Sequence, residues 1–145
     1  MPKQNFANHV RYYTAHHFIY YPLLLIALSA SFCAFGSHPD QKELWLAVIV
    51  IFVFIGWAVF MMRQHYALGN QNRIVRLELR FRYYVITGKR LETLEPSLSF
   101  SQIAALRFAS DEELPELVER TLKEHLTARQ IKKSIVNWLP DHMRV

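Results

Sequence analysis

Two blocks of the chain contain no charged residue, and they constrain its fold more than any other feature. Residues 18–36 read FIYYPLLLIALSASFCAFG, and residues 44–62 read LWLAVIVIFVFIGWAVFMM. A helix of either length is roughly 28 Å long, close to the ~30 Å hydrocarbon core of a bilayer. Helices of soluble proteins normally keep a polar stripe, which neither block has. The blocks therefore predict two membrane-spanning helices, with a pair of buried core helices as the alternative.

A polar connection, SHPDQKE at residues 37–43, joins the two blocks. A connection this short turns the chain between antiparallel neighbours and does little else. The sequence therefore predicts a helical hairpin that follows a lead at residues 1–17. A cleaved signal peptide is an alternative reading of the first block, but its apolar stretch is longer than usual and no strongly basic region precedes it.

Positive charge is concentrated after the second block. Residues 63–90 hold seven Lys and Arg against one acid, Glu78, whereas the loop holds Lys42 against Asp40 and Glu43. Cytoplasmic loops of membrane proteins carry the excess of Lys and Arg. We therefore expect both termini in the cytoplasm and residues 37–43 outside.

Small residues recur at helical spacing in the first block, and Gly56 is the corresponding point in the second. Backbones approach closely at such positions, which favours helix association in lipid. They can pack the hairpin against itself, and they can also bind a second copy of the chain or another membrane protein. The predicted helix-packing residues are Ala27, Ala30, Ser31, Ala34 and Gly56.

Residues 63–88 have the pattern of a basic amphipathic helix that continues from the second block. Ile74, Leu77, Phe81 and Tyr84 recur at the spacing of an apolar helix face. A bend in the helix is expected at Gly69-Asn70. Gly88 is expected to end the helix in the left-handed conformation. The apolar side can pack on the C-terminal residues, or form a short coiled-coil seam. The cations on the adjacent face can bind anionic lipid head groups, and these candidates are Arg73, Arg76 and Arg80. No recognised nucleic-acid-binding fold accompanies them, so a nucleic-acid partner is not expected.

Residues 89–145 predict a small helical module, which makes the whole chain all-α. Ser99 with Gln102, Ser110 with Glu113, and Thr127 with Gln130 each have the spacing of a capping box, so three short helices are expected. Leu114, Leu117, Val118 and Leu122 mark the apolar face of the middle helix. The last helix is expected to carry Ile131, Ile135 and Trp138 and to end before Pro140.

Motifs that carry chemistry are not found in the sequence. It has no phosphate-binding loop, dinucleotide fingerprint, metalloprotease motif or nucleophile elbow, and its single cysteine, Cys33, cannot form an internal disulfide. Because neither apolar block holds an ionisable residue, a pump or transporter is disfavoured. We expect no catalytic residue and no cofactor. The low-ranking candidates for a metal or haem site are His9, His16, His17 and His65.

Several stretches resemble a family of small bacterial two-span membrane proteins of unknown function. They are NHVRYYTAHHFIYYP, MRQHYAL, RIVRLELRFRYYVITGKR, FSQIAALRFASDEELPELVERTLKE and IKKSIVNW, and together they cover nearly the whole chain. The resemblance implies a bacterial inner-membrane setting and the same topology, but no activity. The leading hypothesis is a non-enzymatic, self-associating membrane anchor that presents an interaction module to the cytoplasm. The alternatives are a pore or accessory subunit of a transport complex, lined by Ser29 and Ser31, and a histidine-based metal- or haem-binding membrane protein.

Overall fold

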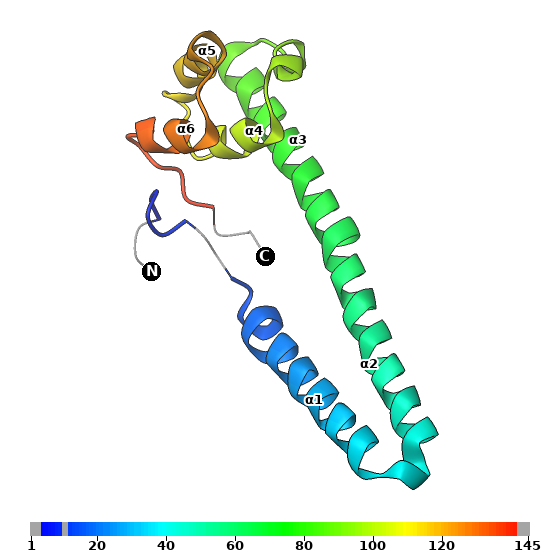
Figure 1. The fold of residues 1–145 in the computed structure, drawn as a ribbon. Helices are drawn as coiled ribbons and strands as arrows, with labels where there is room; N and C mark the ends of the chain where they lie inside the picture. Colours follow the sequence, from blue (N-terminus) through cyan, green and yellow to red (C-terminus); the bar gives the residue numbers. More distant parts are fainter. Residues whose placement is uncertain (1–3, 10–11, 142–145) are drawn as a thin grey trace. The chain divides into compact units, whose positions relative to one another are not determined.

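The computed structural model describes residues 4–9 and 12–141, and the described chain is built from helices (Figure 1). The α-helices are α1 (Tyr21–Ser37), α2 (Lys42–Met61), α3 (Leu68–Thr87), α4 (Phe100–Leu106), α5 (Leu114–Glu124) and α6 (Ala128–Ser134). Shorter helical turns are η1 (Ala15–Tyr20), η2 (Pro39–Gln41), η3 (Met62–Ala67), η4 (Leu91–Thr93) and η5 (Glu95–Ser97). Strand pairing within the described residues is limited to one isolated bridge, between Ala109 and Trp138. The predicted all-α fold is confirmed.

The chain divides into two compact units. The hairpin unit contains residues 12–69, and the helical module contains residues 4–9 and 70–141 of the described chain. In the hairpin unit the chain reverses direction at His38 and η2, and α1 packs against α2. Glu43 lies in the first turn of α2, where a carboxylate interacts favourably with the helix dipole.

Two continuous helices, Ala15–Ser37 and Pro39–Thr87, are long and apolar enough to cross a membrane. In each, only 6% of the most apolar stretch is buried within the chain. A core helix of a soluble protein is mostly buried, so these two helices differ from that alternative in their exposure.

The irregular backbone between α2 and α3 lies at η3, a π-helical stretch, rather than at Gly69-Asn70. At its end the amide of Leu68 donates to the carbonyl of Arg63, five residues back. Gly69 and Asn70 both lie inside α3, and the boundary between the two compact units falls between them. Gly88 does end α3 as predicted, with φ of 68° and its N–H bonded to the carbonyl of Tyr84 at 2.8 Å.

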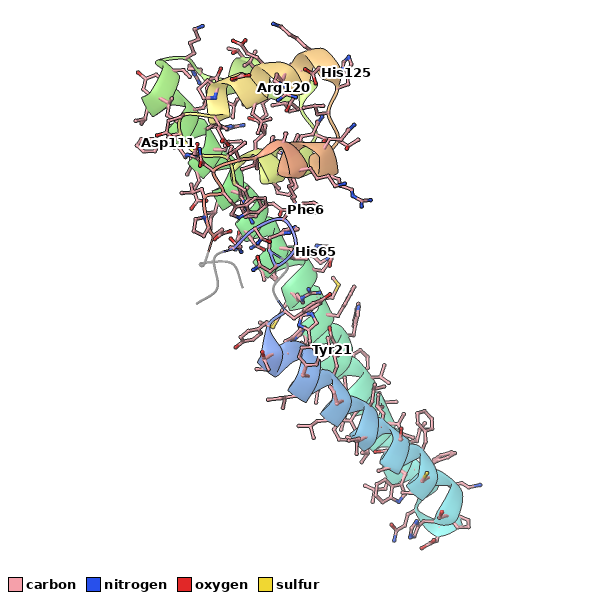
Figure 2. All side chains as sticks on the ribbon, turned by 90° about the vertical axis from the view of Figure 1, so that its left-hand side faces the viewer. Phe6, Tyr21, His65, Asp111, Arg120 and His125 are labelled. Carbon is pink, nitrogen blue, oxygen red and sulfur yellow. The ribbon has the colours of Figure 1, made fainter. Side chains whose placement is uncertain are left out.

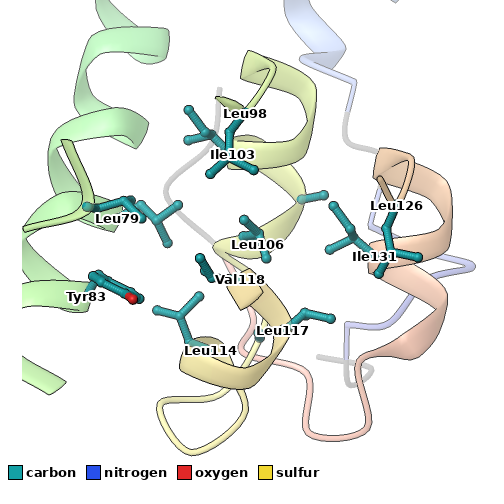
Figure 3. Close-up of a cluster of buried hydrophobic side chains, with 13 residues drawn as sticks. Leu79, Tyr83, Leu98, Ile103, Leu106, Leu114, Leu117, Val118, Leu126 and Ile131 are labelled. Atoms are coloured by element: carbon teal, nitrogen blue, oxygen red, sulfur yellow. The ribbon is translucent and has the colours of Figure 1, made fainter. Parts of the chain in front are cut away.

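A hydrophobic core fills the helical module (Figure 3). It is formed by Leu79, Tyr83, Leu91, Leu98, Ile103, Ala105, Leu106, Ala109, Leu114, Leu117, Val118, Leu126 and Ile131. The predicted apolar face of α5 is confirmed in its buried residues Leu114, Leu117 and Val118, with Leu122 packed at the core's edge. Of the two alternatives for the apolar face of α3, packing on the C-terminal residues is wrong. Val75, Leu79 and Tyr83 are buried, whereas the predicted face points away from the core.

Two of the three predicted capping boxes are present, at Ser99 with Gln102 and at Thr127 with Gln130. The third, at Ser110 with Glu113, is wrong. Helix α5 begins at Leu114 with Pro115 in its first turn, where proline is tolerated because its missing N–H has no intrahelical partner. The carboxylate of Glu113 instead accepts a hydrogen bond from the backbone N–H of Asn137 at 2.9 Å.

The predicted extension of the last helix to Trp138 is also wrong. Helix α6 ends at Ser134 and Ile135 is extended. Trp138 then pairs its backbone with Ala109, and its ring stacks on Phe108 at a centroid distance of 4.6 Å. Burial of this large ring against Phe108 stabilises the chain more than another turn of helix would.

Candidate interaction surfaces

The hairpin unit presents apolar side chains over most of its outer surface (Figure 2). In α1 these include Leu25, Ile26 and Phe32, and in α2 they include Val53, Phe54 and Trp57, each more than half exposed. Apolar patches larger than a few hundred Å² are rare on soluble monomers and mark sites of protein or membrane interaction. The outer surface of α1 and α2 is therefore the first candidate interaction surface.

The inner seam of the hairpin combines small residues with larger apolar ones. Ser31 and Ile49 are the buried residues that the structure assigns to α1 and α2, and Leu24 Cδ2 lies 3.0 Å from the position a Cβ would take on Gly56. Ala27 and Ala34 are half-buried, whereas Ala30 is exposed on the outer side. The Ser31 hydroxyl donates to the carbonyl of Ala27 at 2.8 Å, so its proton is already used within α1. Ser29 is exposed.

The candidate histidines divide between the two units. His16 and His17 lie in η1 with ring centroids 5.4 Å apart, and His65 lies in η3. His9 belongs to the helical module, where Nδ1 is 2.7 Å from the carbonyl of Phe6 and Nε2 is 3.0 Å from Nζ of Lys132. A group of three or more His, Cys, Asp or Glu residues that could hold a metal ion is not found among the described residues.

The cationic face of α3 is held by a buried carboxylate. The side chain of Glu95, in η5, is 8% exposed and accepts from Arg76 Nη1 at 2.5 Å and from Arg80 Nε at 2.6 Å. Arg76 also lies over the ring of Phe100, 5.6 Å from its centroid. We call Arg76, Arg80 and Glu95 the Glu95 clasp. Lipid binding by the three candidate arginines stays a prediction, and only Arg73 of the three lies outside this clasp.

A second set of polar contacts joins α3 to the turn between α4 and α5. Arg82 Nε donates to Asp111 at 2.6 Å, and its Nη1 donates to the carbonyl of Arg107 at 2.9 Å. By contrast, the pair between Arg90 and Glu92 is exposed and 3.4 Å long. A hydrogen bond from its own backbone N–H lowers the pKa of Glu92 below its ordinary value, and the neighbouring Arg90 contributes in the same direction.

The described N-terminal residues 4–9, which we call the N-terminal strap, pack on the end of the chain. The side-chain oxygen of Gln4 accepts from the backbone N–H of Asp141 at 2.7 Å and from the indole N–H of Trp138 at 3.5 Å. The ring of His9 lies 5.9 Å from that of Phe108 and 5.8 Å from that of Trp138. This contact is not predictable from the sequence, because about 130 residues separate its partners.

One face of α3 is exposed in the part of the chain that the structure describes. Ile74, Leu77, Phe81 and Tyr84 are each more than half exposed, and we call them the outer face of α3. The sequence predicts these four residues as one helix face, which packs on the C-terminal residues or forms a coiled-coil seam, and the first of these alternatives is not what the structure has. They form the second candidate interaction surface.

These features define an all-α protein class in which two long apolar helices, packed as a hairpin, precede a small helical module. The chain belongs to DUF6526, a family of unknown function, whose sequence profile matches residues 1–145. The comparison confirms a family of unknown function over the full chain, as the resemblance implied. No curated protein and no solved structure matches the chain significantly.

Proposed function

We propose that this protein is a non-enzymatic anchor of the bacterial inner membrane. Its hairpin unit lies in the bilayer and associates with further copies, and its helical module forms an interaction platform in the cytoplasm. The observation that carries the proposal is the exposure of the hairpin, since 6% of the most apolar stretch of each long helix is buried. Burying one Leu, Ile or Phe side chain is worth about 1.5–3 kcal/mol, so an apolar surface of this extent needs a covering.

The uninterrupted apolar character of the hairpin favours lipid as that covering. A surface that binds a protein partner normally has a rim of polar residues around its apolar centre, whereas residues 44–62 have no charge on any side. The antiparallel packing of α1 on α2 supports a role for the first helix within the hairpin, rather than as a cleaved leader.

The N-terminal strap supports a common compartment for the residues before and after the hairpin, independently of the positive charges. Two spans return the chain to the side on which it started, so the residues before and after the hairpin share one compartment. Gln4 bonds Trp138 and Asp141, and His9 bonds Lys132, which requires that common compartment. The excess of Lys and Arg at residues 63–90 favours the cytoplasm as that compartment.

Charges introduced on the outer surface of the hairpin test the proposal. Val50 and Phe54 are exposed on α2, and an Asp at the centre of a span costs roughly 2.5–3.5 kcal/mol on the insertion scale. A cytoplasm-only fluorescent reporter is fused to Val145 of the full chain. We expect the unchanged fusion to be fluorescent and to sediment with membranes, and Val50→Asp/Phe54→Asp to leave the membrane fraction.

The matched control is Val136→Asp, at a residue of the helical module that is 83% exposed. We expect this fusion to stay in the membrane fraction. A membrane-bound but dark fusion would contradict the orientation, and a double Asp variant that sediments like the unchanged protein would contradict the lipid-facing role of α2. Turnover of a substrate by purified, metal-free protein would contradict the non-enzymatic part of the proposal.

A further inference from the structure

The outer face of α3 can accept a partner without disturbing the core of the module. Its four side chains are 54% (Ile74), 66% (Leu77), 68% (Phe81) and 55% (Tyr84) exposed. Successive residues of a helix are about 100° apart, which puts this face roughly 180° from the core-facing side chains of α3. Those side chains are Val75, Leu79 and Tyr83. A partner on the outer face therefore meets none of them.

The spacing of these four residues is that of a coiled-coil seam. Ile74, Leu77, Phe81 and Tyr84 follow one another at intervals of three, four and three, which makes them positions a, d, a and d of two heptads. Val85, at the following e position, is exposed as well. Val75, Leu79 and Tyr83, which face the core of the module, are at positions b, f and c. The seam and the core therefore lie on different faces of one helix.

Charges on either side of the seam are complementary to a second copy of the same helix. Arg73 is at position g and Glu78 is at position e of the next heptad, and in a parallel coiled coil these two positions face each other across the seam. Glu78 is the single acidic residue between residues 63 and 90. Within the described chain no ion pair engages Arg73 or Glu78, whereas Arg76, Arg80 and Arg82 all have carboxylate partners.

We infer that the outer face of α3 binds the same face of a second copy of this chain. The two helices run parallel and in register, with Ile74, Leu77, Phe81 and Tyr84 in the seam and Arg73 of each copy paired with Glu78 of the other. The inference rests on the proposed function, because two copies inserted in one bilayer with one orientation present their α3 helices in parallel. A two-fold axis then repeats the Arg73–Glu78 pair on both sides.

The charge pattern favours a second copy of the chain, rather than the membrane surface, as the partner of the outer face of α3. A helix that lies on anionic head groups places cations on both flanks of its apolar face. Glu78 occupies one flank of this face and would be repelled there. Two heptads alone make a short coiled coil, but anchoring both copies in one membrane raises their effective concentration and lets a short seam associate.

Cysteine crosslinking in membranes tests the dimer. The full chain carries Cys33→Ala with either Leu77→Cys, at a seam position, or Asn72→Cys, an exposed residue of α3 on another face, as the matched control. Both proteins are first shown to sediment with membranes and are then oxidised. We expect Leu77→Cys to form a disulfide-linked dimer at least about fivefold faster than Asn72→Cys, because only the seam brings identical positions together.

Charge reversal tests the register. Arg73→Glu or Glu78→Arg alone places like charges across the seam twice per dimer, and we expect either change to slow the Leu77→Cys crosslink about fivefold or more. The double reversal Arg73→Glu/Glu78→Arg restores opposite charges, and we expect it to return the rate to within about twofold of the parent.

Three results would overturn the inference while leaving the membrane anchor intact. The first is a membrane-bound protein in which Leu77→Cys and Asn72→Cys crosslink at the same rate. The second is a rate of Leu77→Cys crosslinking that neither single charge reversal changes. The third is a protein that stays monomeric and whose fluorescent label, attached to the cysteine of Leu77→Cys, is quenched by spin-labelled head groups. Recovery of the protein in the soluble fraction would instead reject the proposed function, and the dimer with it.

Discussion

The guanidinium of Arg80 reaches a single carboxylate oxygen of Glu95 with two nitrogens, Nε at 2.6 Å and Nη2 at 2.5 Å from Oε2. The other oxygen of Glu95 is left for Arg76, one turn earlier in α3. Because both arginines flank the buried side of α3, this contact sets the rotation of the helix about its own axis. The same rotation buries Leu79 and leaves Leu77 exposed.

Replacing Glu95 by glutamine should destabilise the helical module. The change removes the negative charge opposite two arginines, and hydrogen bonds to charged groups contribute about 1.5–3 kcal/mol each in stability measurements. Because Arg76 and Arg80 are partly exposed and can regain water, we expect a total loss in that range rather than a larger one. Amide hydrogen exchange in α4 and α5 of the detergent-solubilised chain should then be about tenfold faster or more.

Glu92→Gln is the control for Glu95→Gln. Glu92 forms a long, exposed ion pair with Arg90, and such pairs contribute little to stability, while the hydrogen bond from its own backbone N–H can also be accepted by a glutamine side chain. We expect exchange rates within about twofold of the unchanged chain. Equal effects of Glu92→Gln and Glu95→Gln would show that the Glu95 clasp is not what orients α3.

Alanine in place of Gly88 should also destabilise the module. Gly88 has a φ of 68°, a conformation that costs an L-residue roughly 1–2 kcal/mol. A change of 1 kcal/mol shifts the unfolding midpoint of a domain this size by about 4–8 °C, so the unfolding midpoint of the module, followed by amide hydrogen exchange in α4 and α5, should fall by at least that much. Gly69→Ala is the control, since Gly69 is helical with open space around it, and it should not lower the midpoint.

Phe108→Ala should release the N-terminal strap. The ring of Phe108 is stacked on Trp138 and contacts His9, and truncating a buried Phe costs about 3–5 kcal/mol. Limited proteolysis should then cut within residues 4–9 at least tenfold faster than in the unchanged protein. Val136→Ala, at an exposed residue two positions before Trp138, should leave the cleavage rate unchanged. Equal cleavage in all three proteins would mean that the strap is not docked.

Isoleucine at Gly56 should separate the two helices of the hairpin. A Cβ at this position already lies 3.0 Å from Leu24, and overpacking of this kind costs about 1–3 kcal/mol. Size-exclusion chromatography after heating should show a lower midpoint for loss of the folded peak. Gly36→Ile adds the same side chain where nothing lies within 4 Å, and its midpoint should match that of the unchanged protein. Identical midpoints for both variants would contradict close packing at Gly56.

The hairpin and two of the three caps were predictable because their signals are local, whereas the same spacing at Ser110 and Glu113 forms no cap. The uncharged blocks at residues 18–36 and 44–62 correspond to α1 at Tyr21–Ser37 and α2 at Lys42–Met61. The boxes at Ser99 and Thr127 each depend on a hydrogen-bond pair three residues apart, which the sequence displays directly.

The orientation of α3 was not predictable from its own residues. The helix has apolar residues at helical spacing on two opposite faces, so periodicity alone cannot say which one is buried. The choice depends on Glu95 and Asp111, which lie 15 and 29 residues beyond their arginine partners Arg80 and Arg82. Glu95 stands out only as an acidic residue within the leucine-rich stretch LETLEPSL. Trp138 was misplaced for the same reason, since its partner Phe108 lies 30 residues away.

Alkaline carbonate extraction of membranes from cells that produce the full chain tests the central claim most directly. A protein whose hairpin lies in the bilayer stays in the membrane pellet at high pH and is released only by detergent. We predict that result. Recovery of the intact chain in the carbonate supernatant, monodisperse without detergent, would contradict the account.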